Sequence, residues 1–165
     1  MARPHDGILG YAPGVPGMHD VDDYPDARPV PGLVVYRYDS PLFFANAENF
    51  RQRALKAVAD ANGPVEWLLL NTEANIQVDI TAVDALDSLR DELEERGIVL
   101  ALTRVKQDVR DDLEPSGILD RIGRDRVFYT LPTAVDAYLR WYAGKYGRPP
   151  PDLPGPAEDL KSSGP

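Results

Sequence analysis

Few residues of this chain have side chains that could carry out covalent chemistry. Cysteine is absent, which removes disulfides, thiolate nucleophiles and cysteine-ligated metal sites. The two histidines, His5 and His19, lie in a proline-rich N-terminal stretch, so the expected core holds no general base for a serine nucleophile. The sequence has no Walker loop, no glycine-rich dinucleotide-binding turn after a strand and no Gly-x-Ser-x-Gly motif. We therefore expect no catalytic residues.

Carboxylates are the remaining groups that could bind a metal ion. The densest group consists of Asp108, Asp111, Asp112 and Glu114. Their spacing is typical of the solvated face of a helix and not of a calcium-binding loop. We expect no metal site.

The sequence Asp79-Ile80-Thr81 marks the point where a loop is expected to enter a helix. Asp79 or Thr81 could accept a hydrogen bond from the unpaired amides of the first helical turn. The same helix end carries partial positive charge and could instead bind an anion. Arg104 and Lys106, after the neighbouring strand, would favour the anion, whereas Asp79 would oppose it. The sequence leaves both interpretations open.

The distribution of proline divides the chain into three parts. Of 16 prolines, six lie in residues 1–32 and six in residues 147–165. We interpret residues 1–32 as an arm laid across the domain, with a short edge strand near residues 19–21, because proline is tolerated at a sheet edge. Residues 33–146 form the folded core. Residues 147–165 contain few apolar side chains, which predicts a disordered tail.

Strand and helix patterns alternate in the core. We expect strands at residues 33–38, 65–71, 98–102 and 127–129, separated by helices that begin near residues 47, 81, 106 and 132. Pro115 should kink or end the third of these helices. This order predicts an α/β domain with a mostly parallel sheet. Ligands of such sheets meet the loops beyond the carboxyl ends of the strands, here residues 39–46, 72–81 and 103–106.

Charge and hydropathy exclude two classes of partner. The chain carries 18 Lys and Arg against 27 Asp and Glu, a net charge of −9. This acidic balance argues against nucleic-acid binding, since no basic surplus is available for phosphates. No run of 18 or more apolar residues is present, so no segment is expected to span a bilayer. No secretory signal is recognised, and we expect a cytoplasmic location.

Several motifs together resemble a STAS domain, the domain shared by SulP-type anion (sulfate) transporters and bacterial anti-sigma-factor antagonists. They are Gly14-Val15-Pro16-Gly17 leading to Asp22-Asp23-Tyr24-Pro25, then Val30-Pro31-Gly32, Ser40-Pro41-Leu42-Phe43-Phe44-Ala45-Asn46-Ala47-Glu48 and Asp79-Ile80-Thr81-Ala82. The resemblance covers about residues 10–146, and the transporter branch is the closer match. It implies a mostly parallel sheet of four to five strands with an added N-terminal edge segment, flanked by four to five helices.

The resemblance to the transporter branch also implies a function. The chain would be a non-catalytic regulatory domain on the cytoplasmic side of the membrane, following a transmembrane domain to which it docks. A cytoplasmic regulatory protein could be a further partner, and a guanine or adenine nucleotide could be a weak regulatory ligand. The binding surface that we expect comprises Phe44, Asn46, Thr72, Asp79, Ile80, Thr81, Arg104 and Lys106.

An acidic stripe, defined here as Asp84, Asp87, Asp91 and Glu95, follows one side of the helix that begins near residue 81. The stripe could be an ordinary solvated face. It could also dock to cytoplasmic loops of the transmembrane domain, which are enriched in Lys and Arg. Anionic lipid would repel it, so we expect no direct lipid binding.

Two alternatives remain. The chain could be a freestanding anti-sigma-factor-antagonist-like protein, but the position matching the serine that a kinase phosphorylates in that branch is Ile80, which has no hydroxyl. It could also be a small enzyme acting on a phosphate or nucleotide, with magnesium held by Asp79. No phosphate loop or histidine base supports that activity.

Overall fold

The computed structural model describes residues 6–39, 47–72 and 79–154, which form a five-stranded sheet with helices on both faces. The strands are β1 (Asp6–Tyr11), β2 (Met18–Asp20), β3 (Leu33–Tyr38), β4 (Trp67–Asn71) and β5 (Val99–Thr103). Their order across the sheet is β2-β1-β3-β4-β5. The β3–β4 and β4–β5 pairs are parallel, and β1 is antiparallel to both of its neighbours. The predicted α/β fold is confirmed: the core strands β3, β4 and β5 are parallel, and the added N-terminal segment contributes two antiparallel strands at one edge.

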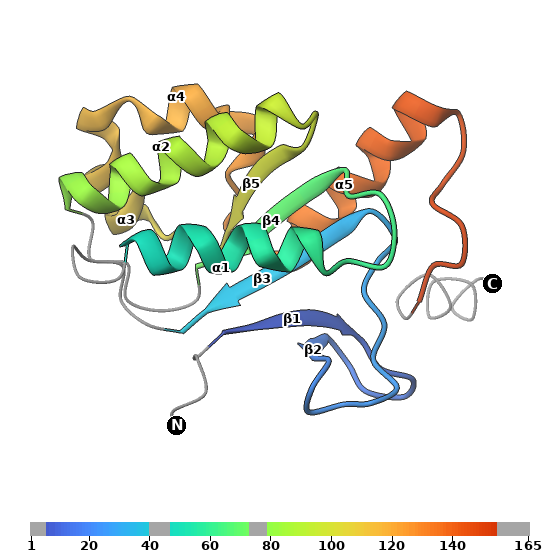
Figure 1. The fold of residues 1–165 in the computed structure, drawn as a ribbon. Helices are drawn as coiled ribbons and strands as arrows, with labels where there is room; N and C mark the ends of the chain where they lie inside the picture. Colours follow the sequence, from blue (N-terminus) through green and yellow to red (C-terminus); the bar gives the residue numbers. More distant parts are fainter. Residues whose placement is uncertain (1–5, 40–46, 73–78, 155–165) are drawn as a thin grey trace.

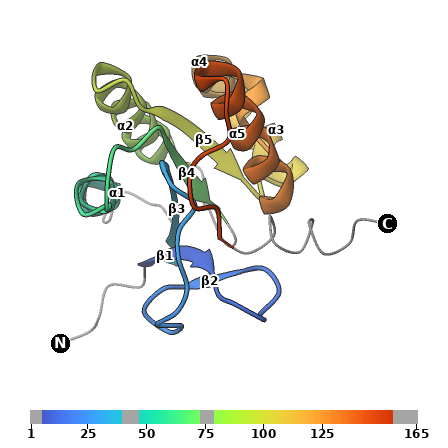
Figure 2. The same ribbon diagram turned by 90° about the vertical axis from the view of Figure 1, so that its right-hand side faces the viewer.

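Two apolar cores lie on opposite faces of the sheet. On one face α1 (Ala47–Ala59) and α2 (Ile80–Glu95) pack over the sheet, with α3 (Gln107–Leu113) and α4 (Ile118–Ile122) beside them. The other face is covered by α5 (Leu131–Tyr146). Figure 2 shows β1 and β2 extending beyond both helical layers. All five residues of β4 are buried, because this strand is covered on both faces.

The helix boundaries follow local sequence signals. Thr130 caps α5 by accepting a hydrogen bond from the Thr133 amide, and Pro132 lies in the first turn of this helix. Pro115 follows the end of α3 and lies in a 3₁₀ turn, Glu114–Ser116, which confirms the predicted break. A second 3₁₀ turn, Arg124–Arg126, follows α4. Helix α4 was not predicted, because its five residues are too few to show a helical pattern in the sequence.

The largest difference from expectation lies in the N-terminal arm. Its residues form a hairpin in which β1 is an inner strand and β2 is the edge strand. The predicted edge strand near residue 19 therefore exists, whereas β1 was missed because its two glycines disfavour a strand. One of them is required by close packing: a Cβ on Gly10 would lie 2.6 Å from the carbonyl carbon of Arg28. The predicted strand at 127–129 reduces to a single bridge between Val127 and Leu102.

The described part of the predicted tail also differs from expectation. Pro150 and Pro154 are buried, and Leu153 packs against the core under α5. Residues 148–154 therefore contact the domain, because their few apolar side chains find a place on this core. Residues 155–165 lie outside the described residues.

Candidate functional site

The carboxyl ends of β3, β4 and β5 meet along one edge of the sheet, where the sequence predicts the binding surface. The parallel register sets Arg37, Asn71 and Thr103 side by side near these ends. Thr72 continues from β4 and is bound to β5: its amide and its Oγ1 both donate to the Thr103 carbonyl oxygen, at 3.1 and 2.8 Å. The structure thus brings Thr72 and the segment after Thr103 together, as expected.

Two cationic side chains follow Thr103 at this edge. Arg104 has a φ of 61°, in the left-handed region that non-glycine residues rarely adopt, and its side chain is exposed. Lys106 is also exposed and precedes α3 in an extended conformation, without a side-chain hydrogen bond to the helix. The short turn between β5 and α3 therefore presents both predicted cations to solvent.

The first turn of α2 forms the second part of the predicted surface. Asp79 is the N-cap, and its Oδ1 accepts a hydrogen bond from the Ala82 amide at 2.8 Å. Of the two caps that the sequence allowed, Asp79 is therefore the one used, and Thr81 lies half-buried inside the helix. A carboxylate already occupies this helix end, which disfavours an anion there.

Ile80 follows Asp79 and is 82% exposed, an unusual position for a large aliphatic side chain. It belongs to α2 but not to its buried face. Two further predicted residues, Phe44 and Asn46, lie outside the described residues.

Tyr129 also belongs to this edge, although the sequence pattern did not single it out. The Val105 amide donates to the carbonyl of the preceding residue, Phe128, at 3.1 Å, which places this segment beside the turn after β5. Tyr129 is 58% exposed, its hydroxyl donates to Gln107 Oε1 at 3.0 Å, and the Arg110 guanidinium lies 4.0 Å from its ring centroid. The Thr-x-Pro start of α5 was the available signal, because it places Tyr129 in the link before the helix.

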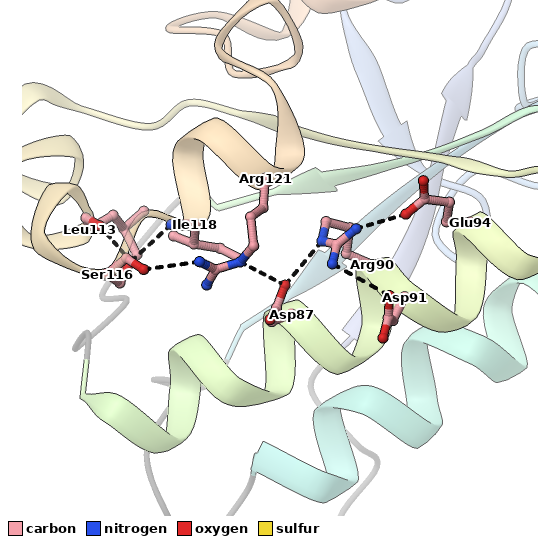
Figure 3. Close-up of polar contacts among 8 residues, drawn as sticks. All are labelled: Asp87, Arg90, Asp91, Glu94, Leu113, Ser116, Ile118 and Arg121. Atoms are coloured by element: carbon pink, nitrogen blue, oxygen red, sulfur yellow. Dashed lines mark hydrogen bonds and ion pairs between the residues drawn. The ribbon is translucent and has the colours of Figure 1, made fainter.

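The acidic stripe on α2 is partly neutralised within the chain, as Figure 3 shows. Asp87 Oδ1 accepts from Arg90 Nε at 3.0 Å and from Arg121 Nε at 3.1 Å. Arg90 also contacts Asp91 and donates to Glu94. Burial would raise the pKa of Asp87, but the hydrogen bonds from the two arginines outweigh it, so its pKa lies below the ordinary value.

The remaining members of the stripe stay accessible. Asp84 and Glu95 are exposed, and the Asp91 side chain is 74% exposed despite its contact with Arg90. The interpretation as a purely solvated face is therefore incomplete, since Asp87 joins α2 to α4 through Arg121. Docking of the stripe to a basic partner stays a prediction.

The described residues offer little support for metal chemistry. Among residues 6–39, 47–72 and 79–154, no group of three or more His, Asp or Glu side chains is placed to hold a metal ion. His19 Nε2 donates a hydrogen bond to the Pro16 carbonyl oxygen at 2.8 Å, and the ring packs against that of Tyr24 in the N-terminal arm. Within the same ranges, no helix is long and apolar enough to cross a membrane.

Comparison with known proteins identifies the class of this domain. Residues 24–134 match the family described as STAS domain, and the chain belongs to that family. The resemblance inferred from the motifs is thereby confirmed.

Its curated relatives include sulfate transporters. The chain is 61% identical over 140 residues to the probable sulfate transporter Rv1739c of Mycobacterium tuberculosis, covering 85% of this chain and 25% of that protein. It is 30% identical over 145 residues to sulfate transporter 1.3 of Arabidopsis thaliana, covering 83% and 22%. The chain therefore spans about a quarter of the length of the relatives that it matches.

A solved structure shows the same fold. The murine anion transporter Slc26a9 matches with a TM-score of 0.73 and 24% identity, over 82% of this chain and 22% of that chain.

Proposed function

We propose that this chain is the non-catalytic regulatory domain of a SulP-type sulfate or anion transporter, on the cytoplasmic side of the membrane. The main observation behind the proposal is that the chain is 61% identical to a probable sulfate transporter over a segment that makes up a quarter of that protein. Identity at that level over nearly all of the folded chain supports a shared role for this part of the two proteins. The absence of cysteine and of a recognisable catalytic motif agrees with a domain that binds rather than transforms its partners.

Within that role, we assign partner docking to the carboxyl edge of the sheet. Two exposed apolar side chains lie at this edge. Ile80 begins α2, and the aromatic Tyr129 lies in the link before α5. Arg104 and Lys106 add positive charge beside them. Apolar and aromatic anchors ringed by charge are the usual composition of protein interfaces. A transmembrane domain of the same protein is the proposed partner.

The first test is the reading frame that encodes this chain. It should also encode a hydrophobic, multi-spanning region before this domain, and a frame without one would contradict the proposal. The second test measures sulfate uptake by the full-length protein carrying Ile80→Asp, with Tyr24→Asp as the control at a partly exposed aromatic residue that follows β2. We expect slower uptake at equal protein abundance for Ile80→Asp only. Equal uptake by both variants and wild type would contradict docking at this edge.

The same edge is also our proposed location for a weakly bound guanine or adenine nucleotide. Arg104 and Lys106 supply the cations that a phosphate chain needs, and the Tyr129 ring could stack on a base. Titration of GTP, GDP and ATP should shift backbone amides of residues 72, 104–106 and 129 in NMR spectra. Shifts scattered over the surface, or none at millimolar nucleotide, would contradict this part of the proposal.

A further inference from the structure

Two buried polar side chains lie next to each other on the sheet face that α5 covers. Asn71 ends β4 and is 4% exposed, and Thr103 ends β5 and is fully buried. The parallel register pairs the two residues directly. Each follows by two positions a residue of the core under α5, Leu69 and Ala101 respectively. Because alternate residues of a strand point to the same face, both polar side chains point toward the α5 side.

Each side chain has an oxygen that the rest of the described chain does not satisfy. Asn71 Oδ1 and Thr103 Oγ1 are shielded from solvent, and neither has a hydrogen-bond partner within the described ranges. Buried polar groups without a partner are rare in native proteins, because they lose their hydrogen bonds to water and gain nothing in return. Two such oxygens on directly paired residues are best explained by one partner that both share.

The chemistry of the two oxygens limits what this partner can be. The amide oxygen of Asn71 only accepts hydrogen bonds, so the partner must donate, which excludes an anion without a proton. Arg37, the cationic residue paired with Asn71 on β3, is not available to bind an anion, because its guanidinium already donates to Asp20 and Asp39 at 3.0 and 2.8 Å. A buried ammonium or metal ion would need a compensating charge. A neutral O–H donor meets both requirements, since it can donate to Oδ1 and exchange a second hydrogen bond with the Thr103 hydroxyl.

We propose that one buried water molecule bridges Asn71 Oδ1 and Thr103 Oγ1. Globular proteins hold about one buried water per 27 residues, typically on polar groups that would otherwise be unsatisfied. The bridge links the carboxyl ends of β4 and β5, which Thr72 already joins through its two hydrogen bonds to the Thr103 carbonyl. It therefore supports the strand ends from which Thr72 and Arg104 enter the candidate surface.

Thr103→Val tests the proposal because valine has nearly the same shape as threonine and lacks the hydroxyl. If the hydroxyl binds water, the variant loses one anchor of the bridge, and its urea midpoint and Tm fall below those of the wild-type chain. If the hydroxyl has no partner, valine removes a buried polar group, and both midpoints stay the same or rise. Thr81→Val, at a half-buried position of α2 outside this pair, is the matched control and should change the midpoints less.

A direct observation completes the test. In dialysed, isotope-labelled protein, NMR should show contacts between a long-lived water and both the Asn71 side-chain amide and the Thr103 methyl group. The contact with the Asn71 side-chain amide should disappear in Thr103→Val. Unchanged or raised midpoints would overturn the proposal. Lowered midpoints without water contacts in the wild-type protein would also overturn it, because the missing partner would then be a group of the protein.

Discussion

The N-terminal hairpin is held to the rest of the domain by a carboxylate whose removal has a calculable effect. Asp6, the first residue of β1, accepts hydrogen bonds from Arg53 Nε at 2.8 Å, Arg53 Nη2 at 2.9 Å and the Tyr36 hydroxyl at 2.7 Å. These contacts connect the hairpin to α1 and β3. We consider Asp6→Asn, which preserves the shape of the side chain, removes its charge and replaces one acceptor oxygen by a donor.

The expected cost follows from what the two partners lose. Tyr36 is 1% exposed, so its hydroxyl cannot exchange a weakened hydrogen bond for water. The Arg53 side chain is 31% exposed and can recover part of its hydration. Breaking a fully buried ion pair costs about 3–5 kcal/mol, and leaving one buried polar group unsatisfied costs about 1–3 kcal/mol. Because Arg53 is only partly buried, we expect the lower range, about 1–3 kcal/mol of unfolding free energy.

The stability difference between wild type and Asp6→Asn should also decrease as the pH falls. Burial raises the pKa of Asp6, but hydrogen bonds from Arg53 and Tyr36 outweigh burial, so the pKa lies below the ordinary value of the group. Such a carboxylate stabilises the fold above the pKa that it has in the unfolded chain, about 3.9. That stabilisation is lost as the pH falls through the lower pKa of the folded state. The gap between wild type and Asp6→Asn should therefore be full at pH 7 and shrink below about pH 4.

Urea unfolding followed by tryptophan fluorescence, repeated between pH 7 and pH 3, measures this gap. Amide hydrogen exchange shows which part of the fold is destabilised. In Asp6→Asn we expect exchange to be faster in β1 than in β4. Tyr36→Phe is the control, because it removes one hydrogen bond and leaves the ion pair with Arg53 intact, so its cost should be smaller. A gap below about 0.5 kcal/mol at pH 7, or one that does not change with pH, would refute the assignment of Asp6 as the anchor.

Three further predictions concern the core, the α2 cap and the acidic stripe. Leu69→Ala, at a fully buried position of β4, should cost about 2–5 kcal/mol in urea unfolding, and a loss below about 1 kcal/mol would contradict a central, tightly packed strand. Asp79→Ala should cost about 0.5–2 kcal/mol because the Ala82 amide loses its cap, whereas Asp84→Ala on the exposed face should change stability much less; equal effects would contradict the capping role. In the full-length protein, combined Asp84→Lys and Asp91→Lys should weaken chemical crosslinking between this domain and a transmembrane domain, and unchanged crosslinking would exclude the stripe as a docking face.

The sequence predicted best the elements whose patterns are strong and local. The buried positions of α2, such as Leu86, Leu89 and Leu93, recur at helical spacing, and the apolar run of β4 requires burial on both faces. The role of β1 could not be predicted in this way. Its two glycines weaken the strand signal, and its place inside the sheet depends on pairing with β3, about 30 residues away in the chain.

The same limit applies to the candidate site. Asp79 could be proposed as a cap because capping depends on residues within one turn. The ion pair of Asp87 with Arg121 depends on how α4 packs against α2, and no local pattern reveals a contact across 34 residues. The exposure of Tyr129 likewise depends on the reduction of the expected final strand to the single bridge at Val127.

The two candidate docking surfaces should contribute differently to binding. A partner at the carboxyl edge removes from water an isoleucine that is 82% exposed, Ile80, and a largely exposed aromatic ring, Tyr129. Their burial supplies affinity that depends little on salt. A partner at the acidic stripe gains less, because Asp87 already binds two arginines and exposed ion pairs are weak. The charge of the stripe mainly steers and orients a basic partner, so raised ionic strength should slow association while docking at the carboxyl edge persists.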